Sequence, residues 1–349
     1  MIMSGVRVVP VVSRKQKKQF LQLPWVIYQR DPLWVPPLRS MQREMVGIAP
    51  HPFYETNEIQ LFIAYRGSEV VGRIAAILNH GHNQRYNEKR GFFGFFESID
   101  DQEVASGLFD AVAAWFAERD IHQLRGPTNP SLNHEVGLLI DGFDKSPTFM
   151  MTYNPSYYVK LVEGYGFEKS QDLLSFYGHI DMLPKIHERY GPVSEQIVDH
   201  FGLKIRSLDQ KRFMDDVTAF LNLYNESLVN TWGFVPMSDG EVRHMARGLR
   251  RLLVPELALV AELDGRVIGV LLGLPDYNPR IREINGRLFP FGFLHLLRNK
   301  RAIKKVRMIS TNVLPEYQRM GVGLALMSAL VPDALKYGLQ EAEFSWVLE

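Results

Sequence analysis

An internal repeat is the feature that most constrains how this chain can fold. The segment Phe62-Ile-Ala-Tyr-Arg-Gly-Ser-Glu-Val-Val-Gly72 recurs as Leu259-Val-Ala-Glu-Leu-Asp-Gly-Arg-Val-Ile-Gly269, so that Ala64 and Ala261 occupy matching positions 197 residues apart. Each copy is an apolar run, a tight turn and a second apolar run, which predicts a β-hairpin. A repeat with so long a period predicts two domains built on one plan.

The same order of elements flanks both hairpins. A short strand pattern and then a helical pattern precede each one, at residues 6–12 and 14–28 in the first copy and 203–208 and 213–228 in the second. A further strand and an amphipathic helix follow each one, with strands at 92–96 and 306–314 and helical stripes at Val104, Leu108, Val112, Trp115 and Phe116, and at Leu324, Met327, Val331 and Leu335.

These patterns predict a mixed α/β (α+β) fold of two tandem lobes, at residues 1–190 and 200–349. Each lobe is expected to place its hairpin and the following strand in one sheet, with helices on the faces of that sheet. The length agrees, because 349 residues exceed what one hydrophobic core ordinarily holds.

Composition excludes several classes of function. The chain has no cysteine, which rules out disulfides, thiolate metal sites and a cysteine nucleophile. A formal charge of +1 gives no overall field that favours nucleic acid or an anionic membrane. The basic run at residues 14–18 follows the apolar start, which is the wrong order for a signal peptide. We therefore expect a cytoplasmic protein that binds neither nucleic acid nor membrane.

The most specific stretch joins the strand at 306–314 to the helix that follows it. Gly321 and Gly323 have no side chains, so the backbone there can approach a ligand closely at the positive end of the helix. Several N–H groups that converge in this way form a site for a pyrophosphate. Arg319 adds a positive charge beside them.

This stretch resembles the acetyl-coenzyme A signature of the GNAT superfamily of N-acetyltransferases. The matching residues are Gln318-x-x-Gly321-x-Gly323, after the strand end Val313-Leu314-Pro315-Glu316. The resemblance implies acetyl-CoA or another acyl-CoA as cofactor, with the pantetheine arm along the Val313 region and the pyrophosphate on the loop. It implies these cofactor-binding residues: Val313, Leu314, Gln318, Arg319, Met320, Gly321, Val322, Gly323 and Leu324.

The first copy carries a decayed version of the same loop. When Gly107 is aligned with Gly323, Ala105 stands opposite Gly321. Asp101 lies near the expected start of the helix, where its carboxylate would repel a phosphate. We therefore expect the first lobe not to bind the cofactor.

A later segment of the first copy also resembles the family. Asn154 precedes a predicted helix that ends at Gly166-Phe167. Many family members place a tyrosine acid seven residues beyond that asparagine, but this chain has Leu161 there. This difference indicates a non-catalytic first lobe.

The family resemblance implies attack of an amine, or less readily a hydroxyl, on a bound thioester. The acceptor would be a small molecule or a peptide, and a strand amide near Leu314 would stabilise the oxyanion. Asn312 is the candidate acceptor-side residue because it alternates with Val313 along the strand. The sequence identifies no general base. Two alternatives stay open: a non-catalytic acyl-CoA sensor or scaffold, and a tandem GNAT-like aminoacyl transferase that uses charged transfer RNA, which the near-zero charge disfavours.

Other polar clusters are interpreted as structural or solvated. The pair His80 and His82, like His134 with Glu135, has no third ligand at informative spacing, so no metal site is expected. A basic cluster before the last strands is interpreted as a solvated loop, and it comprises Arg298, Lys300, Arg301, Lys304, Lys305 and Arg307.

The two copies differ beyond their last shared strand. In the first copy residues 130–180 come after it and include an apolar strand at 173–177, whereas in the second the strand at 343–348 reaches Glu349. We therefore expect a second lobe shortened at its C-terminal end, with an exposed sheet edge and an open cofactor site. An exposed edge favours pairing between chains, so a homodimer through the second lobe is expected.

Overall fold

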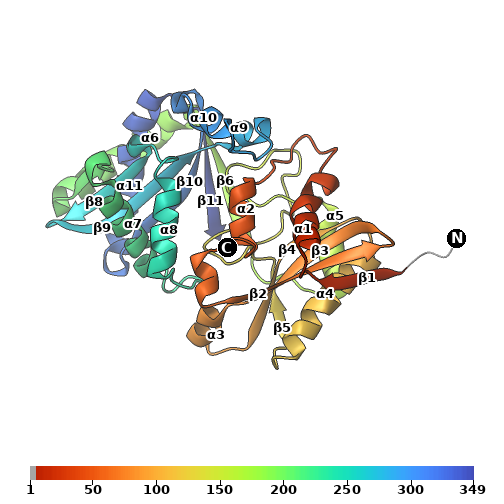
Figure 1. The fold of residues 1–349 in the computed structure, drawn as a ribbon. Helices are drawn as coiled ribbons and strands as arrows, with labels where there is room; N and C mark the ends of the chain where they lie inside the picture. The colour runs from red at the N-terminus through yellow and green to blue at the C-terminus, as the bar shows by residue number, and fades with distance from the viewer. Residues whose placement is uncertain (1–4) are drawn as a thin grey trace. The chain divides into compact units, whose positions relative to one another are not determined.

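The computed structural model describes residues 5–349, which form two compact units, each with its own mixed β-sheet (Figure 1). The first unit contains the chain up to Ser170 together with Asn278–Gly292, and the second contains Gln171–Tyr277 and Phe293–Glu349. The prediction of a mixed α/β fold in two lobes is confirmed. The chain first passes from one unit to the other at residue 170.

The first sheet has the strand order β1-β2-β3-β4-β5 and is antiparallel except for the parallel pair β4 and β5. Its strands are β1 (Val6–Pro10), β2 (Glu58–Arg66), β3 (Glu69–Leu78), β4 (Arg90–Ser98) and β5 (Gln123–Arg125). Its helices are α1 (Arg14–Ile27), α2 (Arg39–Met45), α3 (His80–Tyr86), α4 (Gln102–Ala117) and α5 (Tyr157–Tyr165).

Alternating apolar residues build a core on each face of this sheet. Ile63 and Ile77 face one way and pack with Phe20 of α1, while Ile74 and Phe93 face the other way and pack against α4 and α5. All four strand side chains are fully buried, as expected for a sheet covered on both faces. The capping box between Ser13 and Gln16 fixes where α1 begins.

Residues 278–292 belong to the first unit although they lie between two strands of the second. Three bonds tie them there. Arg39 N–H donates to Gly286 O over 3.0 Å, Trp25 Nε1 donates to Asn285 Oδ1 over 2.6 Å, and Asn278 Nδ2 donates to Pro147 O over 2.7 Å. Helix α9 (Asn278–Glu283) lies in this segment, and α10 (Gly292–Leu297) follows it.

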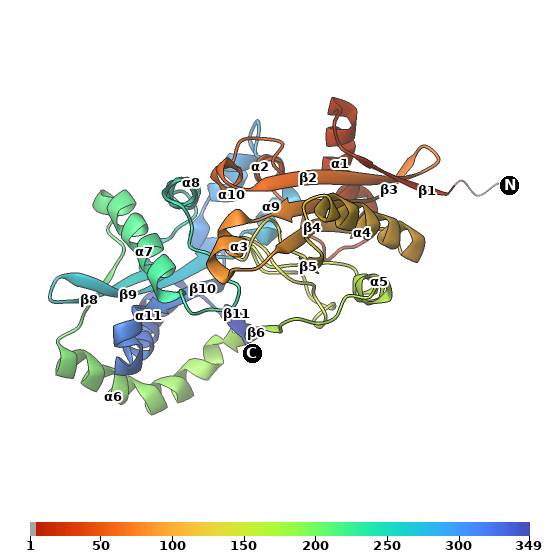
Figure 2. The same cartoon turned by 90° about the horizontal axis from the view of Figure 1, so that it is seen from below.

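The second sheet has the order β6-β11-β10-β9-β8-β7, with α7 and α8 on one face and α11 and α6 on the other (Figure 2). Its strands are β6 (Leu173–His179), β7 (Lys204–Ser207), β8 (Ala258–Leu263), β9 (Arg266–Pro275), β10 (Lys305–Val313) and β11 (Glu341–Leu348). Its helices are α6 (Leu183–Phe201), α7 (Phe213–Ser227), α8 (Asp239–Leu249) and α11 (Val322–Tyr337).

The two hairpins occupy matching places, as the repeat predicted. Ala64 pairs with Gly72, Ala261 pairs with Gly269, and in both copies the register shifts directly after the alanine. The preceding strands also match, because β1 pairs along β2 and β7 pairs along β8 in the same antiparallel sense. The prediction that both copies share one hairpin plan is therefore confirmed.

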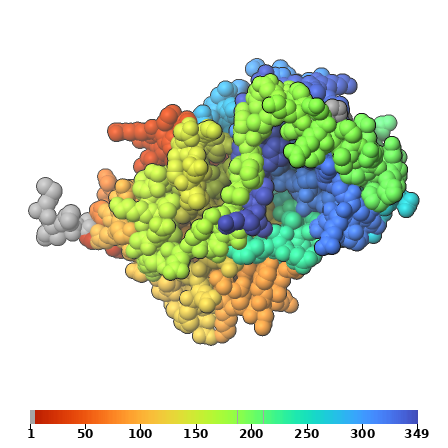
Figure 3. All heavy atoms as spheres, turned by 180° about the vertical axis from the view of Figure 1, so that it is seen from behind, coloured from red at the N-terminus to blue at the C-terminus, as the bar shows by residue number. Residues whose placement is uncertain are grey.

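The expectation of an exposed edge beside the last strand is wrong. Strand β6 pairs antiparallel with β11, from Glu341 opposite His179 to Leu348 opposite Leu173, with one irregularity after Ser345. The strand predicted at 173–177 was expected in the first lobe, but it is β6 and belongs to the second sheet. Helix α6 follows it and forms a ridge along this face of the second unit (Figure 3). Strand β6 therefore covers the edge of β11 through which a homodimer was expected.

Candidate functional site

The start of α11 is an open helix N-terminus built on glycines. Gly321 occupies the N-cap position with φ of +76°, in the left-handed region that favours glycine, and no side chain caps the helix there. At Gly323 an added Cβ would meet only Thr311 Cγ2, at 3.7 Å. No side chain of the N-cap therefore satisfies the N–H groups of this first turn, and uncapped N–H groups at a helix start can bind an anion.

The loop before the helix is η6 (Pro315–Met320). One of its side chains bonds the neighbouring strand, and another is exposed. Gln318 Nε2 donates to Val313 O over 3.1 Å, so this side chain ties the loop to the end of β10. Arg319 is exposed beside it. Leu314 N–H donates to Ile268 O over 2.9 Å, so the expected oxyanion donor cannot be the amide of Leu314 itself.

Strands β10 and β11 are paired over only part of their length. The parallel register runs from Lys305 with Glu341 to Met308 with Phe344, and beyond that point β11 pairs with β6 alone. The rest of β10, residues 309–313, is paired with β9 on one side and has an open edge on the other. The two strands thus separate toward the start of α11.

The direction of each N–H group along β10 shows which amides face the gap between β10 and β11. Successive residues of an antiparallel strand direct their N–H groups to opposite sides. Because Leu314 N–H bonds to β9, the N–H of Asn312 also points toward β9, and those of Thr311 and Val313 point away from it. Thr311 and Val313 therefore offer two backbone donors at the open edge.

Asn312 lies on the α7 face of β10, and its neighbour Thr311 lies on the α11 face. Asn312 is 6% exposed, and its Nδ2 donates to Ser227 Oγ of α7 over 2.8 Å. Its Oδ1 is buried and has no hydrogen-bond partner among the residues that the structure describes. A buried acceptor without a partner is costly, so this atom is suited to receive a donor from a ligand.

Arg307 lies on the same α7 face of β10. Its burial contradicts, for this residue, the interpretation of the basic cluster as a solvated loop. It is 3% exposed, its Nε donates to Ser345 Oγ over 3.0 Å, and its guanidinium lies 5.0 Å from the centre of the Trp346 ring. Nearby, burial raises the pKa of Tyr224 to about 12, although the charge of Arg307 acts in the opposite direction. The sequence contains one indication that Arg307 is buried, because this residue stands between two apolar strand residues, Val306 and Met308.

The packing of the hairpin glycines corrects the alignment of the two loops. A Cβ at Gly72 would collide with Val104 of α4, and a Cβ at Gly269 would collide in the same way with Val322 of α11. Val104 is therefore the counterpart of Val322, and Gly107 is not the counterpart of Gly323. Residue 107 matches residue 325 in this register.

The corrected register shows that the first copy lacks the loop. Ile99 N–H donates to the third residue of β3, as Leu314 N–H donates to the third residue of β9, so Ile99 and Leu314 are counterparts. Five positions separate Ile99 from Val104, whereas eight separate Leu314 from Val322. The segment that holds Arg319 and Gly321 is thus three residues shorter in the first copy.

A carboxylate also fills the helix start of the first copy. Asp101 is the N-cap of α4, and its Oδ1 accepts from Glu103 N–H over 2.9 Å and from Val104 N–H over 3.4 Å. The same carboxylate pairs with Arg66 over 2.7 Å. The positive end of α4 is therefore already neutralised by the protein.

The family-like segment near α5 has a structural role. Asn154 does not cap α5, which begins at Tyr157; its side chain instead bonds Leu139, accepting from the N–H over 2.7 Å. Leu161 is buried in the core of the first unit.

The histidines noted in the sequence have partners within their own unit. His82 Nε2 lies 2.7 Å from Glu88, and His80 Nε2 lies 3.0 Å from Glu58. Among the side chains that the structure describes, no three of the metal-binding types form a group that could hold an ion. No helix in the described part of the chain combines the length and apolarity needed to cross a bilayer.

Comparison with known proteins identifies the family. The model of the "Acetyltransferase (GNAT) family" matches residues 217–348. Over 350 residues the chain is 33% identical to "Bacterial ceramide synthase" of Caulobacter vibrioides (strain NA1000 / CB15N), covering 98% of this chain and 90% of that protein. The chain belongs to the GNAT family.

Other similar proteins also span nearly the whole chain. "Protein YghO" of Escherichia coli (strain K12) is 31% identical over 346 residues, covering 97% of this chain and 87% of that protein. Among solved structures, a tandem GNAT protein from the clavulanic acid biosynthesis pathway has a TM-score of 0.53 at 11% identity, covering 97% of this chain and 89% of that one. This likeness shows the tandem GNAT fold.

Proposed function

We propose that this chain is an acyl-coenzyme A-dependent N-acyltransferase, whose second lobe binds the thioester and joins its acyl group to an amine. The observation that carries this proposal is the position of the open glycine helix start at the end of an unpaired strand edge. A likeness to a protein named "Bacterial ceramide synthase" supports it, because a ceramide is an amide.

The fit to coenzyme A rests on three groups of donors. The N–H groups at Gly321 to Leu324 and the exposed Arg319 suit the pyrophosphate. The N–H groups of Thr311 and Val313 suit the amides of the pantetheine arm, which would take the place of a neighbouring strand along β10. The space in front of Gly323 allows close approach.

The residues of the second lobe position the reactants and do not form a covalent bond themselves. The thioester supplies an activated acyl carbon: the C–N bond forms as the C–S bond breaks, and the proton lost by the amine balances the one gained by the thiolate. Asn312 Oδ1 accepts a hydrogen bond from the amine, and an edge amide of β10 stabilises the negative charge on the carbonyl oxygen.

The first lobe has a structural role in this proposal. Its loop is three residues shorter and its helix start is filled by Asp101. It therefore lacks both the backbone donors and the space that a pyrophosphate needs.

The test is acyl transfer from a panel of acyl-coenzyme A thioesters to a panel of amines, followed by mass spectrometry with thiol release measured in parallel. We expect amide product and free thiol in equal amounts. Gly323→Asp, which places a carboxylate at the proposed phosphate position, should abolish both. Coenzyme A binding with no transfer to any acceptor would favour the sensor, and no binding at all would contradict the proposal.

A further inference from the structure

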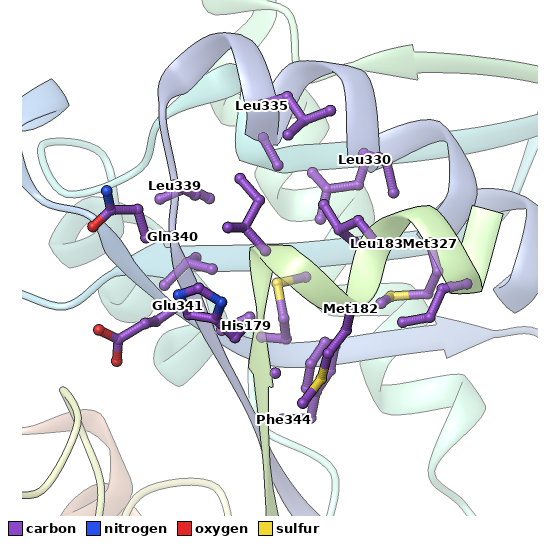
Figure 4. Close-up of a pocket in the computed structure, with 18 residues that line it drawn as sticks. His179, Met182, Leu183, Met327, Leu330, Leu335, Leu339, Gln340, Glu341 and Phe344 are labelled. Atoms are coloured by element: carbon purple, nitrogen blue, oxygen red, sulfur yellow. The ribbon is translucent and has the colours of Figure 1, made fainter.

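The second unit contains an apolar cavity of about 120 Å³ on the α11 face of its sheet (Figure 4). Its walls come from β10, β11, α11 and the segment where β6 leads into α6. Most lining side chains are aliphatic, thioether or aromatic, among them Leu183, Met308, Met327, Leu330, Leu339 and Phe344. An apolar cavity of this kind stays dry or takes an apolar ligand.

The cavity begins where β10 and β11 separate. Met308 and Phe344 form the last pair of the parallel register, and both side chains line the cavity. A thioester that follows the open edge of β10 from the α11 start therefore arrives at the cavity. Residues 308–313 correspond to about 16 Å of strand.

A continuous chain of contacts on the α11 face joins the helix start to the cavity. Thr311 Cγ2 lies 3.7 Å from the position of a Cβ on Gly323. Thr311 Oγ1 lies 3.8 Å from Met327 Sδ, and Met327 lines the cavity. Thr311 is exposed although it lies within a strand, so this route is open to solvent at Thr311.

Helix α11 turns most of an apolar stripe toward the cavity. The sequence predicted this stripe at Leu324, Met327, Val331 and Leu335, but the fully buried start of the helix is formed by Val322 and Leu326. Met327, Val331 and Leu335 instead line the cavity, and Leu335 is 49% exposed. Three of the four residues of the expected stripe thus form a wall of the cavity.

The rim of the cavity is also apolar on the side formed by the start of α6 and the turn before it. Met182, which lies in η2 (Ile180–Met182), and Ile186 of α6 line it and are 47% and 45% exposed. The polar ends of Gln340 and Glu341 point away from the other lining side chains (Figure 4). Exposed apolar side chains gathered at the mouth of an apolar cavity indicate a ligand of the same chemistry.

We propose that this cavity receives the hydrocarbon chain of the acyl group, so that the donor is a medium-length or longer acyl thioester and not acetyl-coenzyme A. The inference rests on the proposed function. An apolar cavity of about 150 Å³ holds benzene, so this cavity holds roughly five carbons beyond the thioester. The apolar rim lets a longer chain continue over Met182, Ile186 and Leu335.

The first test is calorimetric titration of the full chain with coenzyme A, acetyl-coenzyme A and octanoyl-coenzyme A. Each fully buried methylene strengthens binding by about fourfold, so octanoyl-coenzyme A should bind at least about tenfold more tightly than acetyl-coenzyme A. Equal affinities for the two thioesters, with coenzyme A itself bound, would overturn the inference alone. Failure of coenzyme A to bind would contradict the proposed function and the inference together.

A matched pair of variants locates the effect. Ala334→Phe adds a ring to the α11 wall of the cavity, and Lys336→Phe adds the same ring to an exposed position of α11 outside it. We expect Ala334→Phe to remove the preference for octanoyl-coenzyme A without changing the affinity for coenzyme A, and Lys336→Phe to keep the preference. A tenfold preference retained by a folded Ala334→Phe would overturn the assignment of this cavity. Thermal unfolding checks both variants, and the wild-type titration decides the matter if Ala334→Phe does not fold.

Discussion

Gly323→Ala separates the stability of the α11 start from its proposed ability to bind phosphate. Gly323 is the second residue of the helix, and the added Cβ would meet only Thr311 Cγ2, at the ordinary contact distance of 3.7 Å. Alanine is favoured over glycine in helices by about 0.5–1 kcal/mol. The substitution should therefore leave the free energy of unfolding unchanged or raise it by up to about 1 kcal/mol.

The same methyl group should weaken binding of coenzyme A. It occupies the space in which a phosphate would approach the first-turn N–H groups. A hydrogen bond to a charged group contributes about 1.5–3 kcal/mol, so the loss of one such bond corresponds to roughly a 10- to 100-fold loss of affinity. Gly321→Ala is less informative because φ of +76° and Ile197, 2.5 Å from the new Cβ, would disturb the fold directly.

The assay is calorimetric titration of coenzyme A, paired with chemical denaturation of each variant. Gly107→Ala is the matched control, since it makes the same change in α4 of the other lobe, where the Cβ would meet Val8 at 3.3 Å. We expect the control to bind coenzyme A as tightly as the wild type. If Gly323→Ala binds within twofold of the wild type, the phosphate does not lie against this turn and the reasoning is refuted.

Three further predictions concern single residues. Arg73→Leu should lower the free energy of unfolding by about 3 kcal/mol in urea denaturation, because it leaves the buried carboxylate of Glu97 without the opposite charge at 3.3 Å; a loss under about 1 kcal/mol would contradict this. Burial lowers the pKa of His82 below its usual value despite Glu88, so the unfolded state binds the proton more readily and stability should fall as the pH drops below about 6.5. His82→Gln should reduce that fall in denaturation curves measured from about pH 7.5 to 5.5, and an unchanged pH dependence would count against it. Asn312→Ala should lower kcat/KM for the amine at least about tenfold and leave coenzyme A affinity within twofold, and a change in affinity alone would remove its acceptor-side role.

The sequence by itself determined the plan of each half. The repeated hairpin, the strand before it and the helix after it were located within a few residues of their observed bounds, as for α4, expected near 104–116 and found at Gln102–Ala117. Local periodicity is enough for this, because it reports the faces that each element must bury. The glycine loop before α11 could be found for the same reason, since its conformation is set by the residues within it.

The sequence could not determine which strands meet. The pattern at 173–177 predicts a strand, but the residues of an apolar strand do not specify which strand it pairs with. Only the folded second sheet shows β6 beside β11. The sequence also could not fix how the loop before α4 aligns with the loop before α11. A gap of three residues can be placed at several points in the sequence, whereas the contact of Gly269 with Val322 fixes it at one.

Tertiary packing alone decided the surroundings of the site. Arg307 lies among basic neighbours in the sequence, and its burial against Ser345 follows from the pairing of β10 with β11. Helix α11 is apolar on several sides, so its composition does not show which stripe meets the sheet. The sheet takes Val322 and Leu326, and the stripe that includes Met327 is left to line a cavity, because a helix can pack only one face against one sheet.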